Sequence, residues 1–94
     1  MPRRARQCPP GYVYHVLNRG VGRMTLFEDD DDYAAFERAM MRTRQRVPGV
    51  ELFAWCLMPN HWHLLMRPKR VGALSAFMRL FPVIHRQRWH AGCH

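Results

Sequence analysis

Two apolar segments joined by a tight turn constrain the fold of this chain more than any other feature. Val50 to Met58 is apolar on both faces, which is typical of an inner strand. Pro59-Asn60 supplies a turn, and His61 to Met66 returns as a second strand that closes at Arg67-Pro68. The sequence therefore predicts a β-hairpin.

One more strand and one helix are predicted ahead of this hairpin. Tyr12 to Leu17 is rich in aromatic and β-branched residues and is typical of a strand. A helix is predicted from Tyr33, with apolar residues at helical spacing, and Pro48-Gly49 ends it. The acidic run Glu28 to Asp32 caps this helix and complements its dipole. Consecutive carboxylates do not converge on one ion, so we favour the cap over a metal site.

A second helix is predicted to begin near Leu74-Ser75 and to be interrupted by Pro82, which removes a backbone donor. Its apolar face comprises Leu74, Phe77, Met78 and Phe81. The predicted order is strand, helix, strand, strand, helix, which indicates an α+β fold with a mainly antiparallel sheet.

Length and composition restrict the class of protein. A chain of 94 residues supports one domain with a modest core. No apolar run reaches the roughly 18 residues needed to cross a bilayer, and the basic N-terminus lacks the apolar stretch of a secretory signal. Its three cysteines are widely spaced and form no Cys-x-x-Cys pair. We expect a cytoplasmic protein with reduced thiols and no membrane association.

The charge balance indicates a polyanionic partner. Fifteen Lys and Arg against seven Asp and Glu give a net charge of +8, and no acid follows Glu51. Such a surface attracts nucleic acid, because each neutralised phosphate releases condensed counterions. A solvated basic surface kept for solubility explains the charge alone equally well.

His61 and His63 are the candidate metal ligands. Residues i and i+2 of a strand point to the same face, about 6.6–6.8 Å apart along the chain. Two imidazoles at that spacing can reach one divalent cation while Trp62 points into a core. His-x-His pairs also occur by chance on exposed strands, so the surrounding motif has to decide.

The stretch from Cys56 to Leu65 resembles the Met-Pro-Asn-His-x-His-Leu signature of the single-tyrosine HUH transposases. The family pattern upstream of this signature is matched by Tyr14 to Gly20, Arg23, Leu26-Phe27 and the acidic run. The pattern downstream is matched by Leu74-Ser75 and Met78. The combination is similar to the REP-associated tyrosine transposases over nearly the whole chain, from Tyr12 to about His90.

This resemblance implies a ferredoxin-like or RRM-like sheet that carries the two histidines, with helices on one face. It also implies bound Mg²⁺ or Mn²⁺, and a helix tyrosine that attacks single-stranded DNA folded into a hairpin. Residues 1–10 are then a basic arm and residues 11–94 the HUH transposase-like domain, which is expected to be incomplete at its C-terminus and to leave a sheet edge exposed.

The chain departs from the family pattern at the nucleophile. Its tyrosines, Tyr12, Tyr14 and Tyr33, all precede the histidine pair, and the expected tyrosine position falls at His85. His85 can act as a base or a ligand, or be a remnant, but it cannot form a phosphotyrosine link. Gln87 and His90 are the candidates for a third metal ligand.

Structural roles are preferred over functional ones for most of the remaining histidine, cysteine and tryptophan residues. His15 is expected to be structural or adjacent to DNA, Trp55 and Trp62 to lie in the core, and Trp89 to fit either role. His90, Cys93 and His94 can chelate zinc adventitiously, although a frayed tail is preferred.

We expect seven cations to contact DNA phosphates: Arg3, Arg4, Arg19, Arg23, Arg67, Lys69 and Arg70. The leading hypothesis is a transposase-family protein that binds hairpin DNA. One alternative is a non-catalytic remnant that binds hairpins by charge and shape. Another is a metal-dependent nuclease that uses His85 as its base. The sequence does not fix the oligomeric state.

Overall fold

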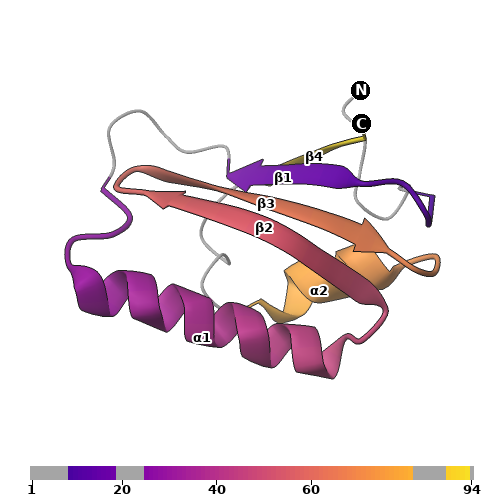
Figure 1. Cartoon of the computed structure of the whole chain (residues 1–94), viewed down its shortest axis with the longest axis horizontal. Coiled ribbons are helices and arrows are strands. Elements are labelled where there is room, and N and C mark those ends of the chain that lie inside the picture. The colour runs from indigo at the N-terminus through magenta and orange to yellow at the C-terminus, as the bar shows by residue number, and fades with distance from the viewer. Residues whose placement is uncertain (1–8, 19–24, 82–88, 94) are drawn as a thin grey trace.

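The computed structural model describes residues 9–18, 25–81 and 89–93, with backbone alone for residues 89, 90 and 93. Its elements are β1 (Tyr14–Asn18), α1 (Asp30–Arg46), β2 (Val50–Met58), β3 (His61–Pro68), α2 (Ala73–Leu80) and β4 (Trp89–Cys93). Every strand pairing is antiparallel, in the order β2-β3-β1-β4. Both helices lie on the same side of the sheet (Figure 1). This arrangement confirms the predicted α+β fold with helices on one face.

Strand β4 is the element that the sequence did not predict. The segment expected to be a frayed tail pairs with β1 along five residues, from Tyr14 opposite Cys93 to Asn18 opposite Trp89. Strand β1 is therefore an inner strand, between β3 and β4. The sequence Trp-His-Ala-Gly-Cys has no clear alternation, so its extended conformation comes from pairing with β1 and not from local preference.

Strand β2 is an edge strand, and the prediction of an inner strand was wrong. Phe53, Trp55 and Met58 are 49%, 38% and 39% exposed. A register shift between Leu52 and Ala54 also interrupts its pairing with β3. Trp55 is therefore not a core residue, and its indole Nε1 donates to Glu37 Oε2 on α1 at 2.8 Å. Apolar composition did not distinguish a central strand from an edge strand that presents apolar side chains to solvent.

Helix α1 begins as its acidic run predicts. Asp29 is the N-cap, and its Oδ1 accepts a hydrogen bond from the Asp32 backbone N–H at 3.0 Å. Three further aspartates occupy the first turn, and Arg44 and Arg46 occupy the last, so both ends complement the helix dipole. The buried side of α1 includes Phe36 and Met40.

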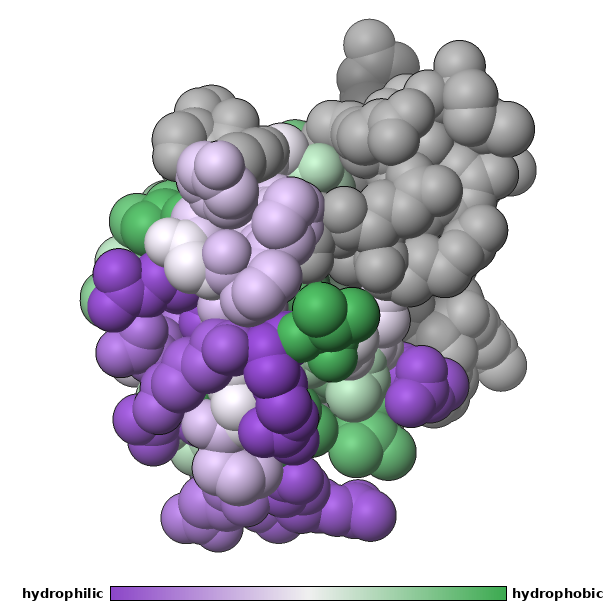
Figure 2. All heavy atoms as spheres, turned by 90° about the vertical axis from the view of Figure 1, so that its right-hand side faces the viewer, coloured by the Kyte–Doolittle hydropathy of each residue, from purple (hydrophilic) through white to green (hydrophobic). Residues whose placement is uncertain are grey.

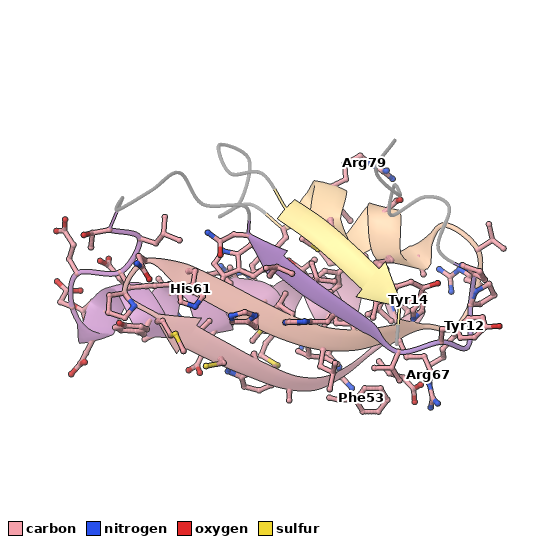
Figure 3. The ribbon with its side chains drawn as sticks, turned by 90° about the horizontal axis from the view of Figure 1, so that it is seen from above. Tyr12, Tyr14, Phe53, His61, Arg67 and Arg79 are labelled. Atoms are coloured by element: carbon pink, nitrogen blue, oxygen red, sulfur yellow. The ribbon has the colours of Figure 1, made fainter. Side chains whose placement is uncertain are left out.

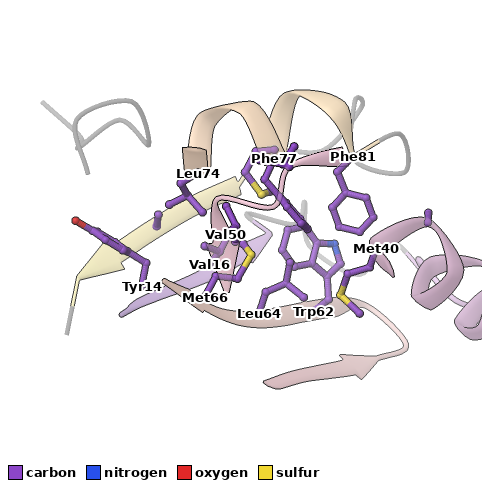
Figure 4. Packing of buried hydrophobic residues seen from close by; sticks show 14 of the residues in the cluster. Tyr14, Val16, Met40, Val50, Trp62, Leu64, Met66, Leu74, Phe77 and Phe81 are labelled. Carbon is purple, nitrogen blue, oxygen red and sulfur yellow. The ribbon is translucent and has the colours of Figure 1, made fainter. Parts of the chain in front are cut away.

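The core lies between the helices and one face of the sheet (Figure 4). Trp62, Leu64 and Met66 alternate along β3 and are at most 1% exposed. The predicted α2 face is confirmed, since Leu74, Phe77, Met78 and Phe81 are all buried. Helix α2 ends at Leu80, while Pro82 lies outside the described residues. No helix in residues 9–18, 25–81 and 89–93 is long and apolar enough to cross a membrane.

Candidate metal centre

His61 and His63 lie on the face of the sheet that no described helix covers. Their neighbours on β3 alternate between buried and partly exposed, which places both rings opposite the core. The two ring centroids are 4.9 Å apart, and the rings are nearly perpendicular at 83°. The structure therefore has the predicted same-face geometry, and metal binding by this pair stays a prediction.

His15 joins this pair from the neighbouring strand. Its Nε2 lies 2.7 Å from His63 Nδ1, with the ring centroids 4.9 Å apart and the ring planes 22° apart. Sequence reasoning treated His15 as structural or adjacent to DNA and did not place it here. Only the register between β1 and β3 brings it to His63, and neither segment carries that register in its own sequence.

Two asparagines fix the backbone and the rings around the pair. Asn60 Oδ1 lies 2.7 Å from His61 Nδ1. Asn18 is 4% exposed, and its Oδ1 accepts a hydrogen bond from the Trp62 backbone N–H at 2.8 Å. Since Trp62 stands between the two histidines, this bond holds the strand that carries them. Asn60 belongs to the recognised motif, but its contact with His61 was not predicted.

The surroundings of His63 lower the pKa of its imidazole. Burial is the first cause, because desolvation penalises the charged ring, and the positive charges of His15 and His61 act in the same direction. His63 is therefore held neutral at neutral pH, which is the form that ligates a metal.

We expect the chain to lose stability as the pH falls below about 6.5, measured without metal. The pKa of His63 is lower in the folded state, so the unfolded chain binds more protons between the unfolded and folded pKa values. The contribution of His63 to the free energy of unfolding is complete above that interval, declines through it and falls no further below it. Urea unfolding in a chelating buffer between about pH 7 and pH 5 tests this. His63→Gln should reduce the slope, and an unchanged slope would contradict the prediction.

An open hollow of about 380 Å³ lies beside His63. It is lined by His15, Ala54, Trp55, Cys56, His63, Leu64 and Leu65. Most of this lining is apolar, and Ala54 and Cys56 belong to the exposed part of β2. The hollow can therefore accept the flat face of an aromatic group next to the imidazoles.

The two imidazoles fit a divalent ion that takes only part of its ligands from the described chain. Each Nδ1 is engaged, by Asn60 or by His15, which leaves both Nε2 atoms as potential ligands. Within the described residues no three His, Cys, Asp or Glu side chains form a metal-binding group. His15 contacts His63 directly, so its Nε2 is not directed at an ion shared with the pair.

The predicted phosphate contacts fall into two sets. Arg3, Arg4, Arg19 and Arg23 lie outside the described residues, as do His85 and Gln87, and the side chain of His90 is not described. In the second set, Arg67 is the penultimate residue of β3, and Lys69 and Arg70 directly follow the strand. Arg67 lies at the opposite end of the sheet from His61 (Figure 3). Figure 2 views this end and shows hydrophilic side chains over much of its described surface.

Arg67 differs from the free phosphate ligand that the sequence suggested. Its Nε lies 2.6 Å from Glu51 Oε1, and its guanidinium carbon lies 5.3 Å from the centroid of the Phe53 ring. The hydrogen bond to Arg67 lowers the pKa of Glu51, so the carboxylate is ionised at neutral pH. Arg70 packs its guanidinium against Gly49, where an added Cβ would lie 2.6 Å from Nη1. Lys69 is exposed.

None of the chain's three tyrosines lies beside the histidine pair. Tyr14 is buried on the helix side, where its hydroxyl donates to the Pro9 carbonyl at 3.0 Å. Tyr33 belongs to α1 and stacks on Phe27 with ring centroids 4.7 Å apart. Tyr12 is 53% exposed but lies at the end of the sheet opposite His61 (Figure 3).

Comparison with known protein families shows which family this chain belongs to. Residues 10–91 match the family model described as "Transposase IS200 like". The chain belongs to the IS200-like transposase family. Transposases of this family generally use a divalent metal ion. No curated protein matches the chain.

A solved structure has the same fold as this IS200-like chain. It is described as "Structure of the REP associates tyrosine transposase bound to a REP hairpin". The TM-score is 0.69 at 14% sequence identity, and the match covers 100% of this chain. This chain spans 62% of the length of that solved chain.

Proposed function

We propose that this IS200-like chain binds single-stranded DNA folded into a hairpin, on the face of the sheet that carries His61 and His63. The observation that carries the proposal is the pair of partly exposed imidazoles beside an apolar hollow, on a face that no described helix covers. A net charge of +8 favours a polyanionic ligand. The solved structure with the same fold was determined with a REP hairpin, which supports the choice of DNA form.

In this proposal His61 and His63 hold a divalent ion through their Nε2 atoms. When bound, such an ion polarises a phosphate and neutralises charge that develops on its oxygens. The apolar hollow beside His63 accepts a base, and stacking of unpaired bases on apolar and aromatic surfaces tolerates many sequences. Lys69 and Arg70, which follow the end of β3 farthest from His61, contact backbone phosphates in this proposal.

A second candidate function is binding without tyrosine-mediated cleavage. It is favoured by the positions of Tyr12, Tyr14 and Tyr33, none of which lies beside the histidine pair. A phenol that attacks a phosphate held at this pair must lie within hydrogen-bond reach of it. Incubation with Mn²⁺ and a hairpin oligonucleotide distinguishes the two candidates. A covalent protein–DNA adduct that His61→Ala abolishes supports cleavage, whereas tight binding without an adduct supports the second.

The binding face can be tested with one substitution at two exposed alanines. Ala54 pairs with Leu65 on the open face, and Ala35 lies on α1 on the other side of the sheet. Ala54→Asp is expected to weaken binding of a labelled hairpin with a single-stranded tail by about tenfold or more, because it places a carboxylate against phosphates. Ala35→Asp changes the net charge equally and should leave the Kd within about twofold of the unaltered chain.

Both variants should be compared by fluorescence anisotropy at several salt concentrations. Binding by phosphate contacts predicts that the affinity falls steeply as salt rises. Equal losses in Ala54→Asp and Ala35→Asp would show that net charge, and not the open face, determines binding. No detectable binding by the unaltered chain would reject the proposed function.

A further inference from the structure

We propose that His15 is a positioning residue that sets the proton arrangement of His63, so that His63 presents its Nε2 to the divalent ion. This inference rests on the proposed metal site at His61 and His63. The observation that motivates it is the 2.7 Å contact between His15 Nε2 and His63 Nδ1.

The strand register explains why this contact exists. His15 lies opposite Leu65 and Leu17 lies opposite His63, so His15 and His63 are diagonal neighbours on the open face. Diagonal pairs on adjacent antiparallel strands are far enough apart that only long side chains meet. The ring planes are 22° apart and the centroids 4.9 Å apart, so the 2.7 Å contact joins the rings edge to edge, with a nitrogen of one directed at a nitrogen of the other.

Between two neutral rings this contact holds one hydrogen, and the nitrogen that carries it decides whether His63 Nε2 can ligate a metal. If His15 Nε2–H donates, His63 Nδ1 is the acceptor, and neutral His63 must carry its proton on Nε2. That nitrogen then cannot ligate a metal. If His63 Nδ1–H donates instead, His15 Nε2 is the acceptor and the lone pair of His63 Nε2 is free. Metal binding therefore selects the second arrangement, in which His15 carries its own proton on Nδ1.

Asn60 has the corresponding role for His61, but without this choice. Its Oδ1 can only accept, so the 2.7 Å contact requires the proton on His61 Nδ1 and leaves Nε2 as the ligand. His61 is thus fixed in the binding-competent form, while His63 depends on a partner that can donate or accept. Orienting partners of this kind contribute about 10–100-fold to metal affinity.

Mn²⁺ affinity, measured by electron paramagnetic resonance of the free ion, tests the role of His15. His15→Ala is expected to weaken binding by about 10–100-fold. His15→Gln should recover most of this loss, because its amide oxygen can accept the His63 Nδ1–H. Leu17→Ala is the matched control: Leu17 lies on the same strand and face, directly opposite His63, but offers no hydrogen bond. It should change the affinity by no more than about twofold.

Nitrogen NMR of the imidazoles with Zn²⁺, a diamagnetic probe, gives a readout that loss of packing does not reproduce. In the unaltered chain and in His15→Gln, His63 should be ligated through Nε2 and protonated on Nδ1. Without metal, His63 of the His15→Ala variant should be predominantly in a form not protonated on Nδ1. The His63 signals are assigned as those that disappear in His63→Gln. Circular dichroism should confirm that each variant is folded.

The outcomes separate this inference from the metal site on which it rests. An unaltered chain that binds no Mn²⁺ overturns the metal site, and the role of His15 with it. A chain whose affinity falls in His61→Ala but stays unchanged in His15→Ala keeps the metal site and overturns the role of His15. Failure of His15→Gln to recover both affinity and the His63 proton arrangement also overturns it.

Discussion

Trp62→Ala is expected to lower the free energy of unfolding by about 3–5 kcal/mol, the largest stability effect of a single substitution that we predict. The Trp62 side chain is 0% exposed, and its ring centroid lies 5.8 Å from that of Phe36 on α1. Truncation leaves a cavity between β3 and the helices that neighbouring side chains fill only in part. Since domains of this size are stable by about 5–15 kcal/mol, the variant approaches the limit of folding.

Trp55→Ala is the matched control, measured with Trp62→Ala by urea unfolding. It removes the same side chain from the edge strand β2, where Trp55 is 38% exposed and donates one hydrogen bond to Glu37. The expected loss is about 1 kcal/mol. Both side chains face the helices, so the comparison isolates burial, and similar losses in both variants would contradict the central position of Trp62 and the edge position of Trp55.

His61→Ala is expected to remove stabilisation of the chain by Mn²⁺. An ion that binds only the folded chain raises the free energy of unfolding by about 2.7 kcal/mol at a hundred times its Kd. The proposed site takes two ligands from the described chain, so loss of one imidazole should reduce this gain to nearly zero. Thermal unfolding with and without Mn²⁺, with a chelator to reverse the effect, measures it.

His94→Ala is the control for adventitious binding in that experiment, because it removes an imidazole from the C-terminal His-Ala-Gly-Cys-His sequence. Its Mn²⁺ stabilisation should equal that of the unaltered chain. A loss in His94→Ala with none in His61→Ala would place the metal elsewhere and contradict the site.

The sequence shows which cations the chain has, but only the fold shows which of them already pair with an acid. The sequence identified Arg67 as a cation after a strand, but its ion pair with Glu51 depends on two strands lying in register. The Glu51 carboxylate partly neutralises the charge of Arg67, so Lys69 and Arg70 carry more of the proposed phosphate binding than the sequence implied. A local pattern shows which charges exist, and the fold decides which are already neutralised.

The sequence by itself determined the features that depend on neighbours along the chain. Alternation placed Trp62 in the core and His61 and His63 on the opposite face, because successive side chains of a strand point to opposite sides. The acidic run located the start of α1, because orphan N–H groups of a first turn need an acceptor within a few residues. These features require no knowledge of which strands are adjacent.

Only the tertiary structure decided which segments lie side by side. It placed β2 at an edge, added β4 beside β1, and brought His15 to His63. Strand order and register are set by the total free energy of burying one face of the sheet against the helices, and that energy belongs to no single segment. The His15–His63 contact, on which the proposed role of His15 depends, is therefore a property of the assembled sheet.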